Sequence, residues 1–315
     1  MPKIISVINF KGGVGKTTVS VNVAACMAHK YGKKVLLVDL DPQSNASIWM
    51  LGEARWQDLA TKHKKRNIAG IMLGWVNPKN TVETPFRDPG TGRGLIPQLD
   101  VIPAVYWMFY LEDHILRSRH AEVIKGTYKK HDEYRYLQKT LLPFLAEAEY
   151  DAVILDCPPN MYNVSKNAIF ISHHYVVPCI PDTLSTIGLK QLLDQVEEFA
   201  GKTKAFGGSA PSLLGVLINR FEGPGVAETP LEDMEGTLRT YRNKPSLTVR
   251  KGSKVLSESP IRRYNAHQYA CESSLPVCLF SERHPSDARA KNAASDIAGV
   301  TEQIMKKAGL QNDHD

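Results

Sequence analysis

The segment from residue 4 to residue 18, IISVINFKGGVGKTT, constrains the fold of this 315-residue chain more than any other. It begins with nearly continuous β-branched residues, which is typical of a strand buried on both faces of a parallel sheet: Ile4, Ile5, Val7 and Ile8. Gly12, Gly13 and Gly15 then free the backbone to wrap around an anion, and residues 19–31 have the apolar spacing of a helix. This order predicts a loop whose amides, helix dipole and Lys16 hold nucleotide phosphates, leaving the Thr17 hydroxyl to bind Mg²⁺.

The motif departs from the general P-loop pattern, because Phe10 stands where that pattern has its first glycine. The residues found here, KGGVGKTT, resemble the deviant Walker A motif of the ParA/MinD family of ATPases, in which an extra lysine precedes the glycines. The resemblance implies that Lys11 reaches across a dimer to the partner's phosphates, and that Lys11 and Lys16 serve catalysis. It also implies an ATP site made by Lys11, Gly12, Gly13, Val14, Gly15, Lys16, Thr17 and Thr18. The alternative is a glycine-rich turn with incidental lysines.

The composition, with 43% hydrophobic and 23% charged residues, predicts one ordinary globular α/β domain over residues 1–315. The five cysteines form no CxxC pair, which fits a reducing, cytosolic setting and no zinc site. No apolar run reaches the 18 or more residues of a membrane span, and the first residues do not resemble a signal peptide, so we expect a soluble protein. Residues 52–98 are rich in proline and glycine and contain a basic patch at 62–66, which indicates an irregular or inserted surface segment.

A second buried strand, starting at Val35, ends in the acidic sequence VDLDPQSNAS. Asp39 and Asp41 share a face if the strand continues; if it ends at Asp39, Asp41 lies in the loop at the carboxyl edge of the sheet, where ligands of open parallel sheets bind. The stretch resembles the DxDPQ switch I motif of the ParA family, which implies that Asp41 positions the attacking water and Asp39 supports the metal site. The alternative is that both acids only cap the next element.

A third buried strand, AVILDCPPN at 152–160, also ends in an acid, as in the Walker B arrangement. Asp156 is therefore expected to bind Mg²⁺ together with Thr17 and Asp39, and the two prolines fix the turn that follows. The match to the family's DCPP is close, but Asn160 stands where the family usually has serine. The resemblance therefore does not extend to this residue of the switch II turn.

The remaining elements follow from apolar patterns. We expect strands at 99–104, 175–181, 212–221 and 276–280, and helices at 106–119, 136–148, 183–199 (capped by Thr183 or Ser185) and 287–308. The strand at 212–221 ends in Asn219 and Arg220. In related ATPases the asparagine at this place reads the adenine edge, so the resemblance implies that Asn219, with Arg220 beside it, binds the nucleotide; a turn-forming asparagine is the alternative. His173 and His174 are expected before the strand, at the surface or in a loop, and the acidic end NDHD is expected to fray.

Positive charge is concentrated between residues 239 and 263, which hold eight basic residues and one acid, a net charge of +7. The whole chain carries +6, so the other 290 residues sum to −1. Such a concentration is typical of a surface that binds a polyanion, although a solvated basic face is the alternative. The segment also resembles the family's basic loop, which implies nonspecific DNA contacts by Arg250, Lys251, Lys254, Arg262 and Arg263.

Together these motifs resemble a short ParA-type partition ATPase with the three-layer P-loop fold, a mostly parallel twisted sheet flanked by helices. The resemblance implies weak ATP hydrolysis with Mg²⁺, a homodimer on ATP binding, nonspecific double-stranded DNA as the track, and a ParB-like or other cargo adaptor that stimulates hydrolysis. It implies a cytoplasmic, nucleoid-associated protein of a bacterium or archaeon. Two alternatives are a MinD-like membrane-associated ATPase and a metabolic P-loop synthetase.

Overall fold

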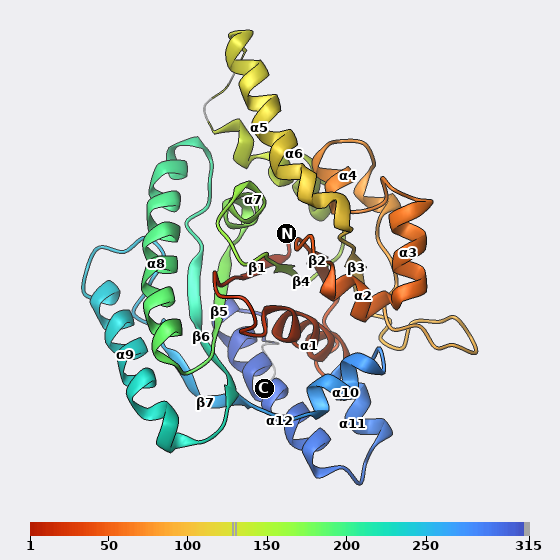
Figure 1. The fold of residues 1–315 in the computed structure, drawn as a ribbon, viewed down its shortest axis with the longest axis vertical. Helices are drawn as coiled ribbons and strands as arrows, with labels where there is room; N and C mark the ends of the chain where they lie inside the picture. The colour runs from red at the N-terminus through yellow and green to blue at the C-terminus, as the bar shows by residue number, and fades with distance from the viewer. Residues whose placement is uncertain (128, 130, 312–315) are drawn as a thin grey trace.

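The computed structural model describes residues 1–127, 129 and 131–311, and the NDHD end lies outside them. Seven strands form one sheet in the order β3-β2-β4-β1-β5-β6-β7, and every neighbouring pair is parallel (Figure 1). The strands are β1 Lys3–Val7, β2 Val35–Asp39, β3 Leu99–Ile102, β4 Ala152–Asp156, β5 His174–Cys179, β6 Ser212–Phe221 and β7 Val255–Arg262. The predicted parallel α/β sheet is therefore confirmed.

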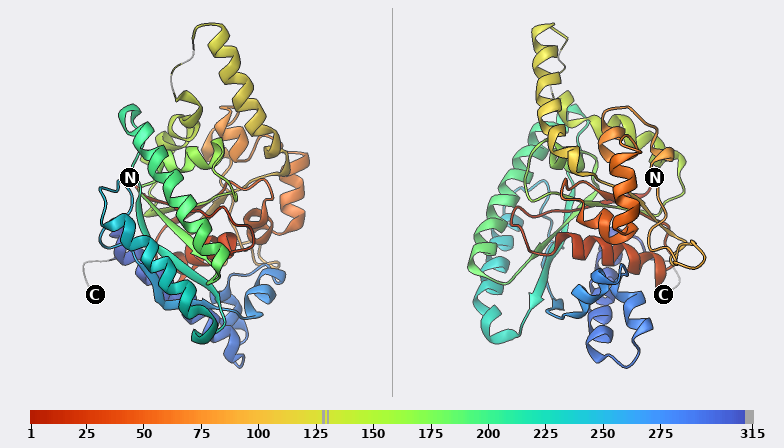
Figure 2. Two further views of the ribbon diagram at one scale, coloured as in Figure 1. Left: turned by 60° about the vertical axis from the view of Figure 1, so that its left-hand side comes forward. Right: turned by 45° about the vertical axis from the view of Figure 1, so that its right-hand side comes forward.

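Helices cover both faces of the sheet. They are α1 Lys16–His29, α2 Asn45–Leu51, α3 Glu53–Thr61, α4 Ile68–Met72, α5 Phe109–Ile124, α6 Tyr136–Glu147, α7 Asn163–Ile171, α8 Thr183–Thr203, α9 Pro224–Arg242, α10 Ala266–Glu272, α11 Val277–Arg283 and α12 Ala288–Ala308. Short 3₁₀ turns occur at Pro78–Asn80, Tyr106–Met108, Asp132–Tyr134 and Lys204–Phe206. α5 projects beyond the rest of the molecule (Figure 2).

Successive strand residues point into two separate cores, which explains why the strands are apolar without alternation. Ile4 and Leu36 pack with α4 to α9, whereas Ile5 and Leu37 pack with α1, α2 and α10 to α12. All four side chains are at most 1% exposed. Two covered faces fix the register of the central strands, and so they fix the loops at the strand ends.

Three expectations about elements were wrong. Residues 276–280 are not a strand but the start of α11, where Val277 and Phe280 face the core one helical turn apart, and the last strand is β7. Asp182, not Thr183 or Ser185, caps α8, since its carboxylate accepts a hydrogen bond from the Ser185 amide. His174 lies within β5, not in a loop.

Residues 52–98 are less irregular than expected. They contain α3 and α4, and the apolar side of α4 lies in the core at Ile68, Ile71 and Met72. Asn67 caps α4, because its side chain accepts from the amides of Ala69 and Gly70. The segment from 53 to 72 is thus part of the packed domain.

Candidate nucleotide-binding site

The glycine-rich loop joins β1 to α1, as predicted, and Gly15 is the residue it can least replace. Gly13 and Gly15 have φ of 75° and 88°, a region that favours glycine. A Cβ at Gly15 would lie 2.0 Å from Asn219 Nδ2, whereas a Cβ at Gly12 or Gly13 would meet nothing within 4 Å. The backbone around Gly12 and Gly13 is therefore open, and the loop fits the close approach of a phosphate group.

Lys16 extends beneath this loop. Its side chain is buried, with 7% exposure, and Nζ donates to the carbonyl oxygen of Lys11 at 3.1 Å. Burial lowers the pKa of Lys16, while the carboxylates of Asp156 and Asp41 act in the opposite direction. A desolvated ammonium inside the loop is suited to phosphate oxygens, which would replace the carbonyl as its partner.

Thr17 and Asp156 form an oxygen pair that fits Mg²⁺. Thr17 Oγ1 donates to Asp156 Oδ2 at 2.8 Å, and Ser20 Oγ donates to Oδ1 at 2.8 Å. Burial raises the pKa of Asp156 to about 6, and these two hydrogen bonds act against the rise. Hydroxyl and carboxylate oxygens are the hard ligands that Mg²⁺ takes next to a nucleotide, and the bound ion would supply charge neutralisation at the phosphates.

The two acids after β2 have different surroundings. β2 ends at Asp39, whose carboxylate is fully buried and accepts from the Ser47 amide (2.9 Å), the Ser47 hydroxyl (2.7 Å) and the Asp41 amide (3.0 Å). Burial, together with the nearby Asp156, raises the pKa of Asp39 to about 8. Asp39 therefore ties β2 to the first turn of α2. Asp41 lies in the loop, as the shorter strand predicts, and accepts from the Gln43 amide at 2.9 Å.

Lys11 is held within its own chain. Its Nζ lies 2.6 and 2.9 Å from the carboxylate oxygens of Asp182 and 3.2 Å from Ser185 Oγ, at the start of α8. The two side chains are 30% and 39% exposed. Burial opposes ionisation of Asp182, but the hydrogen bonds from Lys11 and Ser185 lower its pKa. The structure thus pairs the extra lysine of the motif with an acid of its own chain.

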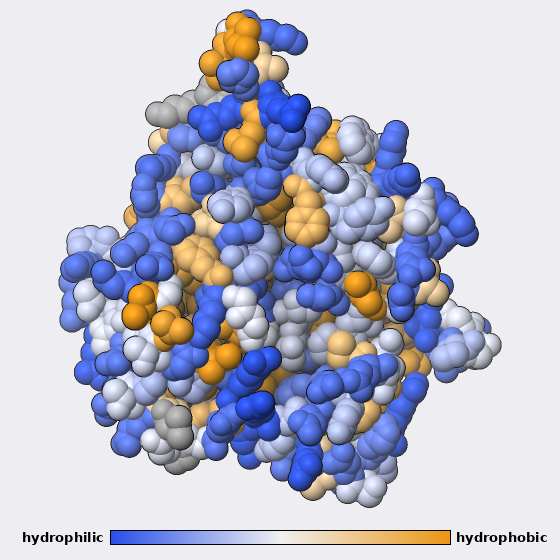
Figure 3. Space-filling model, in the orientation of Figure 1, coloured by the Kyte–Doolittle hydropathy of each residue, from blue (hydrophilic) through white to orange (hydrophobic). Residues whose placement is uncertain are grey.

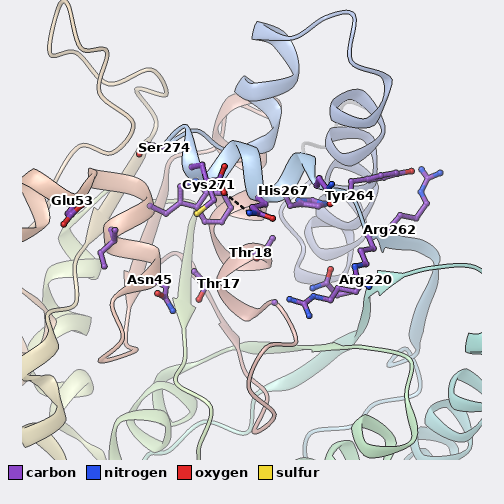
Figure 4. A pocket seen from close by; sticks show the side chains of 18 residues that line it. Thr17, Thr18, Asn45, Glu53, Arg220, Arg262, Tyr264, His267, Cys271 and Ser274 are labelled. Carbon is purple, nitrogen blue, oxygen red and sulfur yellow. Dashed lines mark hydrogen bonds between the residues drawn. The ribbon is translucent and has the colours of Figure 1, made fainter.

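A cavity of about 770 Å³ opens beside the P-loop (Figure 4). Thr17 and Thr18 enter it from α1, Asn219 and Arg220 from the end of β6, and α10 lies across from them. Asn219 Nδ2 also donates to the Val14 carbonyl at 2.8 Å, which joins β6 to the loop. The volume of the cavity is in the range of small-molecule sites. The structure thus brings Asn219 and Arg220 to the P-loop, as the sequence predicted.

The predicted DNA-binding residues do not lie together. β7 runs parallel to β6 from Val255 to Arg262, so Arg250, Lys251 and Lys254 lie at the amino end of the strand. Arg262 and Arg263 lie at its carboxyl end, where they line the cavity and pair with Asp296 and Glu222, respectively. The paired span of β6 covers five residue steps, so the two groups are about 16 Å apart or more.

Sequence reasoning missed the outer wall of the cavity. His267, Gln268 and Cys271 of α10, together with Trp49 of α2, line it. No motif marks these residues, and they come from segments more than 200 positions apart. A weak signal was available in the mixed polar and apolar stretch AHQYACE, which begins four residues after the end of β7.

Comparison with known proteins now identifies the family. The AAA domain family AAA_31 matches residues 2–206, about two thirds of the chain. The chain belongs to this family. It is a ParA/MinD-type P-loop ATPase, and its relatives include a chromosome partitioning protein, ParA of Caulobacter vibrioides. The match ends before β6, so the cavity walls from β6, β7 and α10 lie outside the matched range.

Two relatives align over most of the ATPase. The sporulation initiation inhibitor protein Soj of Bacillus subtilis is 28% identical over 82% of this chain and 88% of its own length. A virulence plasmid ParA family protein, pGP5-D of Chlamydia psittaci, is 28% identical over 97% of this chain and 95% of its own. The ATPase is thus similar both to a sporulation initiation inhibitor protein and to a virulence plasmid ParA family protein.

Solved structures share its fold. A single-residue variant of McdA from Cyanothece, in complex with ATP, has a TM-score of 0.69 at 16% identity, and the match covers 99% of this chain and 98% of that one. Cobyrinic acid a,c-diamide synthase from Mycobacterium smegmatis, with an ATP analogue and magnesium, has a TM-score of 0.67 at 20% identity, with 97% and 95% covered. The fold family therefore binds nucleotide and Mg²⁺. Within the described residues, every helix is too short or too polar to span a bilayer.

Proposed function

We propose that this ATPase forms an ATP-dependent dimer, binds duplex DNA without reading sequence, and positions a DNA or protein cargo in a bacterial or archaeal cell. Two chains enclose ATP and Mg²⁺, each lending Lys11 to the other's phosphates. Asp41 orients the attacking water, and slow hydrolysis is accelerated by a cargo-bound adaptor of the ParB kind. The whole of residues 1–315 acts as one ATPase domain.

The observation that carries the dimer is a set of exposed apolar side chains around the mouth of the P-loop. Tyr106, Phe109 and Tyr110 follow β3, Tyr162 follows β4, and Leu184 and Ile187 follow β5; all are at least 50% exposed. The carboxyl ends of these parallel strands meet at the edge that also carries the P-loop. Apolar residues lie over the base of α5 and the start of α8 in Figure 3. Large apolar side chains gathered at one edge are typical of a protein contact.

Lys11 lies within this edge. Its partner Asp182 precedes Leu184 and Ile187 directly, so a second chain docking on them would reach the ion pair. The ion pair is partly exposed, and such pairs contribute only about 0.2 to 1 kcal/mol to stability. Little free energy is therefore needed to separate Lys11 from Asp182. Lys11 is therefore available for exchange from Asp182 to the phosphates of the other subunit.

DNA binding is supported by the basic residues that are not engaged by an acid. Of the eight in the 239–263 segment, Arg242, Lys254, Arg262 and Arg263 are in ion pairs. Among the described residues, Arg239, Lys244, Arg250 and Lys251 make none, and all four lie before β7 at the amino side of the sheet. We therefore assign the first DNA contacts to Arg250 and Lys251, which are exposed on a turn.

The membrane alternative is less well supported. It needs apolar residues near the C-terminus that are available to lipid. Ile304, Met305 and Leu310 are instead buried to 8% exposure or less, packed with α1 and the sheet. A synthetase shares the fold, so the fold alone does not separate that alternative; DNA binding does.

The test is binding of random-sequence duplex DNA, with ATP and Mg²⁺ and without them, by fluorescence anisotropy across a salt series. Arg250→Ala with Lys251→Ala should weaken ATP-dependent binding equally for unrelated sequences and flatten the salt slope by about one unit per lost contact. Arg289→Ala with Lys291→Ala, an exposed pair on α12 with the same change of charge, is the control. An unchanged slope in the first variant would remove this turn from the DNA surface. No ATP-dependent binding by the unaltered protein would contradict the proposed function.

A further inference from the structure

The loop of residues 157–162 connects the end of β4, where Asp156 lies, to the first turn of α7. Its start is fixed to the sheet, because the Cys157 amide donates a hydrogen bond to the Val7 carbonyl of β1 at 3.2 Å. The position of its far end depends on how the first turn of α7 is held. This far end decides how the loop lies beside the carboxylate that pairs with Thr17.

A glutamate from another helix caps α7. Tyr162 occupies the N-cap position, and its side chain makes no capping hydrogen bond. Glu112 of α5 supplies the cap instead: Oε2 accepts from the Asn163 amide at 3.0 Å and from Asn163 Nδ2 at 2.8 Å, and Oε1 accepts from the Val164 amide at 2.9 Å. A carboxylate at a helix N-terminus satisfies amides that lack a partner within the helix and interacts favourably with the helix dipole. Glu112 thus ties the far end of the loop to α5.

The first turns of α5 give Glu112 a firm base. Leu111 and Ile115, on the inner side of the helix, are at most 1% exposed and pack in the core. Phe109 and Tyr110, by contrast, are exposed and belong to the apolar edge on which a second chain is proposed to dock. The far end of the loop is therefore fixed against the edge at which ATP would join two chains.

We propose that Glu112 is a positioning residue for ATP hydrolysis, which holds the loop after Asp156 in the arrangement that the reaction needs. This inference rests on the proposed ATPase activity and adds to it a residue outside the P-loop and the acidic strand ends. Phosphoryl transfer depends mainly on the placement of charge and of the attacking water, so a displaced loop beside a Mg²⁺ ligand lowers kcat. ATP affinity comes mainly from the loop between β1 and α1, and it should not depend on Glu112.

The test measures phosphate release by the full chain and, separately, its affinity for a non-hydrolysable ATP analogue with Mg²⁺. Glu112→Ala should lower kcat about tenfold, the population shift that the loss of one helix cap produces, and should leave the affinity unchanged. Glu112→Gln keeps one acceptor oxygen for the Val164 amide and should recover part of the lost rate. Asp113→Ala is the control: it removes the next acid of α5, which is 57% exposed and pairs with Arg117, and kcat should not change.

Hydrogen exchange in the protein without nucleotide, followed by mass spectrometry, reports on the loop itself. Glu112→Ala should speed exchange in peptides that cover residues 157–164 and should leave the peptides of α1 unchanged. Unchanged exchange in the loop would overturn the inference, and so would a normal kcat in a chain whose loop exchanges faster. A loss of analogue affinity as large as the loss of kcat would also overturn it, because Glu112 would then act on nucleotide binding. If the unaltered chain releases no phosphate from ATP, the proposed function fails, while the exchange measurement still decides whether Glu112 holds the loop.

Discussion

The ion pair between Lys11 and Asp182 allows a direct test of the exchange on which dimerisation depends. Asp182→Asn removes the negative charge that holds Lys11, but asparagine caps a helix about as well as aspartate, so α8 should keep its N-terminus. The change therefore affects the ion pair with little effect on the fold. We predict that the variant forms a tighter ATP-dependent dimer than the unaltered chain.

The expected size follows from the exposure of the pair. With 30% and 39% of the side chains exposed, each pair contributes about 0.2 to 1 kcal/mol. Two pairs open when two chains associate, so the variant gains about 0.4 to 2 kcal/mol. The dimer dissociation constant should then fall by a factor of about 2 to 30. The effect should shrink as salt screens the pair in the unaltered chain.

Sedimentation velocity with a non-hydrolysable ATP analogue and Mg²⁺, over a range of protein concentrations, measures this constant. Glu198→Gln is the matched control, because it removes an acid from an exposed ion pair on the same helix. It should leave the constant unchanged. A weaker or unaltered dimer in Asp182→Asn would show that Lys11 does not leave Asp182 on association, and the exchange would be refuted.

Three further predictions concern the site and the core. Gly15→Ala should lower the free energy of unfolding by about 2 to 4 kcal/mol in urea titrations, from backbone strain and the displaced Asn219, whereas Gly12→Ala should change it little. Asp41→Ala should keep ATP binding and dimerisation but stop phosphate release; normal turnover would move the water-positioning role elsewhere. Folding raises the pKa of Asp39 to about 8, so near neutral pH the native state holds a proton that the unfolded state releases. The free energy of unfolding should therefore fall as the pH rises from 6.5 to 8. The fall should be up to about 2 kcal/mol larger in the unaltered chain than in Asp39→Asn. Equal slopes would contradict this burial.

Local patterns predicted the central part of the molecule. A few adjacent residues were enough to predict the strands β1, β2, β4 and β6 and the glycine-rich loop between β1 and α1. The structure has all of them as expected. The apolar run at 276–280 was predicted wrongly, because a short apolar segment fits a strand and a buried helix equally well. In the structure Val277 lies in α11, and β7 forms the edge of the sheet.

The partner of Lys11 within the chain was beyond the reach of the sequence. Lys11 meets Asp182 only because parallel strands bring distant loops to one edge. The basic segment shows the reverse effect. Its residues are close in sequence, but the segment includes the whole of β7. Arg250 precedes this strand and Arg262 ends it, so the two residues lie at opposite ends of the strand.

The central claim is that ATP joins two copies of this chain through the edge that carries the P-loop. The most direct measurement is the molar mass in solution, by light scattering after gel filtration, with a non-hydrolysable ATP analogue and Mg²⁺ at saturation. The account predicts a dimer with the analogue and a monomer without it. It also predicts that Tyr110→Asp, a charge on the exposed apolar edge, prevents the change. A chain that stays monomeric when saturated with nucleotide would contradict the account.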